Sequence, residues 1–78
     1  MPDPTAEEWI RDLAARLGVD PPNAAEQDEI LDLAGVAAHA SERTAAPLSC
    51  WLVARAGLTP ESGLALVRQL AEANGDQA

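Results

Sequence analysis

The sequence is short and strongly acidic: 78 residues carry 13 Asp and Glu against 5 basic side chains, which gives a net charge of −8. Nucleic acids and anionic membrane surfaces are bound through Lys and Arg, so we expect neither as a partner. Cys50 is the single cysteine, which excludes an intramolecular disulfide. A chain of this size is then expected to gain stability by association, with another protein or with itself.

The composition predicts an all-α protein. Alanine, the best helix former, occurs 17 times, whereas Phe and Tyr are absent. We predict one small four-helix bundle-like domain with short loops over residues 5–75, between tails at 1–4 and 76–78. No apolar run approaches the ~20 residues that a membrane span needs. The N-terminal residues lack the features of a signal peptide, so we expect a cytoplasmic protein.

Capping patterns predict the first two helices. Thr5 and Glu8 match a capping box, and Gly18 suits the left-handed residue that ends a helix. Asn23 and Glu26 repeat the pattern at the start of a second helix, which is expected to end before residue 41. The apolar face of the first helix consists of Ala6, Trp9, Ile10, Leu13, Ala14 and Leu17. That of the second consists of Ile30, Leu31, Leu33, Ala34, Ala37 and Ala38.

Two prolines predict the starts of the other helices. Residues 41–46 are expected to be a connection, because Pro47 disfavours helical geometry at the residue before it. A third helix then spans 47–56 and ends at Gly57. The fourth begins with Thr59 as cap and Pro60 at the first helical position, and ends at residues 74–75. Its apolar stripe consists of Leu66, Val67, Leu70 and Ala71, flanked by Leu64 and Ala73.

The third helix carries the first candidate site. It is apolar nearly all round, so it is either central to the bundle or covered by a partner. Leu48, Trp51 and Arg55 share one stripe, and the arginine has two interpretations. Its head group reaches a carboxylate at the end of the bundle, or it lies at an interface beside an exposed tryptophan. The predicted partner interface is Pro47, Leu48, Trp51 and Arg55.

A second candidate site lies around the connection before this helix. Arg43, Ser49 and the free N–H groups at the helix start are suited to an anion such as a phosphate, with His39 nearby. The 13 acidic side chains compete for Arg43. The anion-binding or nucleotide-binding interpretation is therefore kept as the alternative to protein interaction.

Catalysis and metal binding are the weakest interpretations. Cys50 sits among apolar residues and His39 has no partner at catalytic spacing, so a minimal enzyme that uses both is only a third hypothesis. Asp32 shares the face of His39 but lies seven residues away, about 10.5 Å along a helix, too far for one ion to bridge. We expect no catalytic residue, no metal ligand and no cofactor.

Several segments carry a family resemblance that spans about residues 8–73. They are Asp32-Leu33-Ala34, Ala37-Ala38-His39, Arg43, Ala46-Pro47-Leu48 and Trp51-Leu52-Val53, preceded by Trp9, Leu13, Leu17 and Gly18. The sequence resembles a small, mainly actinobacterial family of unknown function, found alone or fused to MobA-like molybdenum-cofactor guanylyltransferase domains. The resemblance implies an association with molybdenum-cofactor maturation, and the family has no established activity to carry over. The expected function is a non-catalytic accessory module that assists such a nucleotidyltransferase or the maturation of molybdoenzymes.

Overall fold

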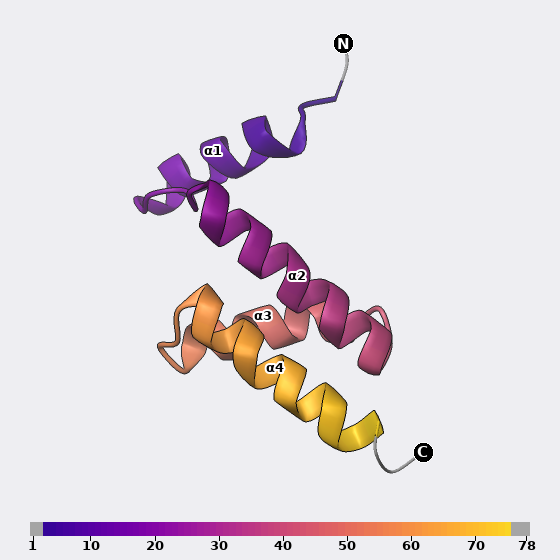
Figure 1. Cartoon of the computed structure of the whole chain (residues 1–78). Coiled ribbons are helices and arrows are strands. Elements are labelled where there is room, and N and C mark those ends of the chain that lie inside the picture. The colour runs from indigo at the N-terminus through magenta and orange to yellow at the C-terminus, as the bar shows by residue number, and fades with distance from the viewer. Residues whose placement is uncertain (1–2, 76–78) are drawn as a thin grey trace.

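A computed structural model describes residues 3–75 as four helices joined by short connections. They are α1 (Ala6–Leu17), α2 (Ala24–Ala40), α3 (Ala45–Arg55) and α4 (Pro60–Gly75) (Figure 1). The described range holds no strand, so the all-α prediction is confirmed. The predicted tail at 76–78 and the first two residues of the tail at 1–4 lie outside the described residues.

The predicted caps of α1 and α2 are confirmed. Thr5 Oγ1 accepts from the Glu8 N–H at 3.1 Å, and Glu8 Oε1 accepts from the Thr5 N–H at 2.9 Å. Asn23 and Glu26 form the same reciprocal pair at the start of α2. Gly18 ends α1 with φ 71°, a left-handed conformation that glycine adopts at little cost. These bonds satisfy N–H groups that every helix start leaves without an intrahelical partner.

The start of α3 differs from the prediction. Ala45 and Ala46 are helical although Pro47 follows them, so the connection is two residues shorter than expected. The Ala45 N–H donates to the Glu42 carbonyl at 2.9 Å and the Ala46 N–H to the Arg43 carbonyl at 3.2 Å. Pro47 is tolerated as the third residue of the helix, because an N–H at that position has no intrahelical acceptor to lose.

The core forms where α2, α3 and α4 meet. Both α3 and α4 pack against α2, and Leu33 of α2 is 1% exposed. A Cβ atom built on Gly63 of α4 would collide with Val53 of α3 and lie 3.1 Å from Leu33 Cδ1. Gly63 therefore allows the three helices to approach closely. The buried side chains of this core are Leu33, Ala37 and Leu64, and Ala14 of α1 is buried outside it.

The buried face of α4 is rotated from the predicted stripe. Gly63 and Leu64 are buried and Val67 is half-buried, whereas Leu66 and Leu70 are exposed. The prediction that Leu66 and Leu70 belong to the packed stripe is wrong. The physical reason is the close approach at Gly63, which turns the side of α4 that carries this glycine toward α2 and α3.

Helix α1 stands apart from the other three helices (Figure 1). Within residues 3–75, no Cα atom of α1 lies within 8 Å of a Cα atom in α2, α3 or α4. Leu13 and Leu17 on its apolar face are 41% and 66% exposed. The expectation that this face packs inside a bundle is therefore wrong for the isolated chain. The radius of gyration is 14.1 Å, against about 11.5 Å for a compact domain of this length.

None of the described helices is both long enough and apolar enough to cross a membrane.

Candidate functional site

The predicted interface on α3 is exposed. None of the 11 residues of α3 is buried, and Leu48 and Trp51 are 64% and 62% exposed. Pro47 and Arg55 are exposed as well. The sequence left open whether this apolar helix is central to the bundle or covered by a partner. Its large apolar side chains are not covered, as they would be in a helix at the centre of the domain.

Arg55 lies over Trp51, with its guanidinium carbon 5.9 Å from the centre of the indole ring. This distance suits a cation–π contact. The ion pairs within residues 3–75 are both on α1, so the head group of Arg55 does not reach a carboxylate there. Of the two interpretations of Arg55, the geometry fits the one that places it beside an exposed tryptophan.

We use the name α3 face for Leu48, Trp51, Leu52 and Arg55. All four residues are exposed, three are large and apolar, and the fourth is a cation. The helix carries no acidic residue, although the chain as a whole has a net charge of −8. Exposed aromatic and arginine side chains on one helix face are typical of the centre of a protein interface.

The three residues of the predicted anion site come from different segments. His39 is exposed in the last turn of α2, Arg43 is exposed in the turn that follows, and Ser49 is half-buried within α3. The start of α3 offers fewer donors than expected. The Ala45 and Ala46 N–H groups already bond to the turn, and Pro47 has no N–H. Any anion site here would depend on the Arg43 side chain, which pairs with no carboxylate in the described part of the chain.

Cys50 faces a small apolar pocket of about 180 Å³, also lined by Ile30, Leu33, Val53, Ala54, Leu58 and Pro60. Burial raises the pKa of its thiol above the ordinary value. A nucleophilic cysteine needs the opposite shift, because the thiolate is the reactive form. Across residues 3–75, no group of three His, Cys, Asp or Glu side chains is placed to hold a metal ion.

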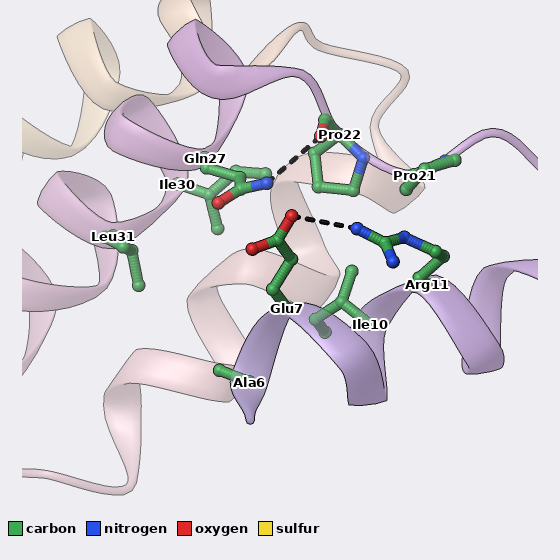
Figure 2. Close-up of a pocket in the computed structure, with 9 residues that line it drawn as sticks. All are labelled: Ala6, Glu7, Ile10, Arg11, Pro21, Pro22, Gln27, Ile30 and Leu31. Carbon is green, nitrogen blue, oxygen red and sulfur yellow. Dashed lines mark hydrogen bonds and ion pairs between the residues drawn. The ribbon is translucent and has the colours of Figure 1, made fainter. Parts of the chain in front are cut away.

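A larger cleft, of about 390 Å³, lies between α1 and the start of α2 and was not predicted from the sequence (Figure 2). Ile10 of α1 and Ile30 and Leu31 of α2 line it, and the Pro21–Pro22 corner closes one end. The remaining lining residues are Ala6, Glu7, Arg11 and Gln27. Glu7 and Arg11 form an ion pair of 2.8 Å along one side, and Gln27 Nε2 donates to the Pro22 carbonyl at 3.2 Å. The two consecutive prolines were the available signal, since they fix a corner between two amphipathic helices.

Comparison with known proteins places the chain in a family. No curated protein matches it, and no solved structure matches it. A family model described as "Domain of unknown function (DUF6457)" matches residues 1–78, the whole sequence. The predicted membership of a family of unknown function is thus confirmed, and the chain belongs to the family Domain of unknown function (DUF6457).

Proposed function

We propose that this protein is a non-catalytic interaction module that docks onto another protein through the α3 face. One observation carries the proposal: α3 is apolar on most sides, yet its large side chains Leu48, Trp51 and Leu52 are 64%, 62% and 60% exposed. Leaving Leu48, Trp51 and Leu52 in water is unfavourable, and a partner surface would remove that cost. The Arg55–Trp51 stack adds the residue pair that most often dominates such interfaces.

The proposed partner is a MobA-like nucleotidyltransferase of molybdenum-cofactor biosynthesis, which the domain would assist in the cytoplasm. The support for this partner is the resemblance to the mainly actinobacterial family that occurs alone or fused to such enzymes. A matching surface on the enzyme would offer an apolar depression for Trp51 and a carboxylate for Arg55. The arginine would then exchange a contact with its own tryptophan for a charge-assisted hydrogen bond.

Calorimetric titration of the purified guanylyltransferase from the same genome into this protein tests the proposal. Trp51→Ala is expected to weaken binding by about 30-fold or more, as a hot-spot truncation of ≥ 2 kcal/mol does. Leu70→Ala is the matched control, because Leu70 of α4 is as exposed as Trp51 but lies outside the α3 face. No binding by the wild type, or equal losses in both variants, would contradict the proposal.

Anion or nucleotide binding at Arg43 remains the second candidate. Its support is that Arg43 is exposed and pairs with no carboxylate in the described range. Titration with inorganic phosphate and with GTP, followed by calorimetry, should then show saturable binding that Arg43→Ala abolishes. Heats that do not saturate, or that persist in the variant, would eliminate this candidate.

A further inference from the structure

A second apolar surface lies on α1. At about 100° per residue, Trp9, Leu13 and Leu17 fall on one side of the helix, and all three are exposed. We call these three residues the α1 stripe. Ala14 is buried, and Ala6 and Ile10 line the cleft toward α2, so one side of the apolar face of α1 is turned toward its own chain. The α1 stripe adjoins these cleft-lining residues around the helix and is left exposed.

The whole chain exposes far more surface than a folded monomer of its mass. Its accessible area is 6296 Å², whereas about 4,500 Å² is expected for 8.1 kDa. The excess is about 1,800 Å². A standard stable interface buries about 800 Å² on each partner, so half of the excess would be enough to form one.

We propose that the α1 stripe is the dimerisation surface of this protein, and that its occupant is α1 of a second copy. The two helices pack across a twofold axis, and each enters the cleft between α1 and α2 of the other chain. Leu31, which is 68% exposed at the α2 side of the cleft, is covered by the incoming helix. This surface is separate from the α3 face, so a dimer still presents two copies of the proposed partner site.

The arrangement satisfies the requirements of a twofold interface. Such an interface uses the same patch on both chains, and here the exposed α1 stripe and a cleft lined by Ile10, Ile30 and Leu31 (Figure 2) belong to one molecule. The charges of α1 are largely compensated within the chain. Arg11 pairs with Glu7 at 2.8 Å and Arg16 with Asp12 at 3.4 Å, so the two helices meet with little charge opposing them.

Analytical ultracentrifugation with three matched proteins tests the proposal. The wild type is expected to sediment at twice the chain mass of 8.1 kDa. Leu13→Glu places a carboxylate at the centre of the stripe and should raise the dissociation constant about 30-fold or more. Ala15→Glu adds the same charge on the opposite, exposed side of α1 and should leave the dimer intact. Glutamate favours helix, so circular dichroism should show equal helicity in both variants.

Intermolecular nuclear Overhauser effects in a mixture of isotope-labelled and unlabelled chains test the mode of packing. Contacts are expected between α1 of one chain and Ile30 or Leu31 of the other. Because each chain has a net charge of −8, raising the salt concentration should strengthen the dimer, as the Debye length falls from about 30 Å at 0.01 M to about 3 Å at 1 M. A monomeric wild type, whether extended or with α1 folded back, overturns the proposal. So does a dimer that Leu13→Glu leaves unchanged or that lacks these contacts.

Discussion

The close approach of three helices at Gly63 makes Gly63→Ala the most informative single substitution. In a helix, alanine is favoured over glycine by about 1 kcal/mol, so sequence preference alone predicts a more stable protein. The structure predicts the opposite. The new Cβ would collide with Val53, a β-branched side chain whose rotamer is fixed in a helix, and would lie 3.1 Å from Leu33 Cδ1.

The expected cost follows from comparison with a second glycine. Overpacking of a core by one methyl group costs about 1–3 kcal/mol. Gly35 lies inside α2, and a Cβ there meets no atom within 4 Å. Gly35→Ala should therefore stabilise the protein by about 0.5–1 kcal/mol, and Gly63→Ala should be less stable than Gly35→Ala by about 1–3 kcal/mol.

Urea denaturation at one fixed protein concentration measures both values, since a self-associating chain has a concentration-dependent stability. The slope of the free energy of unfolding against urea should be the same in both variants. If Gly63→Ala and Gly35→Ala stabilised the protein equally, the helices would not approach closely at Gly63, and the rotation of α4 would need another cause.

Three further outcomes are expected. Hydrogen bonds with Thr5 lower the pKa of the Glu8 carboxyl below 4.5. The contribution of this capping box to the free energy of unfolding is therefore present above pH 4.5 and is lost as the pH falls through the folded-state pKa. The chemical shift of the Glu8 carboxyl during an acid titration measures that pKa. Leu33→Ala should cost about 2–5 kcal/mol, against less than about 1 kcal/mol for the exposed Leu66→Ala, both measured by urea unfolding. Cys50, whose pKa is raised by burial, should react with iodoacetamide more slowly than free cysteine at pH 8, and an equal rate would contradict its placement.

Local chemistry made the helix boundaries largely predictable. The capping residues Thr5 and Asn23 and the stop at Gly18 act within one turn of sequence, so their pattern predicts structure directly. Pro60 begins α4 as predicted. The predicted start of α3 was wrong because of Pro47. The residue that precedes a proline disfavours helix only weakly, and here the hydrogen bonds of the preceding turn override that preference.

The packing of the helices was less predictable, because it depends on residues distant in sequence. An apolar face on a helix predicts that the face is covered, but it does not identify what covers it. For α1 and α3 the cover is absent from the isolated chain, so Leu13 and Trp51 are exposed. Gly63 was overlooked, although a glycine within a helical segment is a known sign of close approach. Its partner Val53 could be identified only from the structure.

The corner between α1 and α2 has a kinetic consequence. Gly18 ends one helix and the Asn23 cap starts the next, which leaves four residues between them, two of which are the ring-constrained Pro21 and Pro22. So short a connection, half of it proline, restricts the angles that α1 can take relative to α2 before any other molecule arrives. A binding surface that is already in place pays little ordering entropy on association. The association rate constant should then have the ordinary value for rigid docking, about 10⁵–10⁷ M⁻¹s⁻¹, without a slower folding step. Differences in affinity should therefore come mainly from the dissociation rate, that is, from the lifetime of the complex.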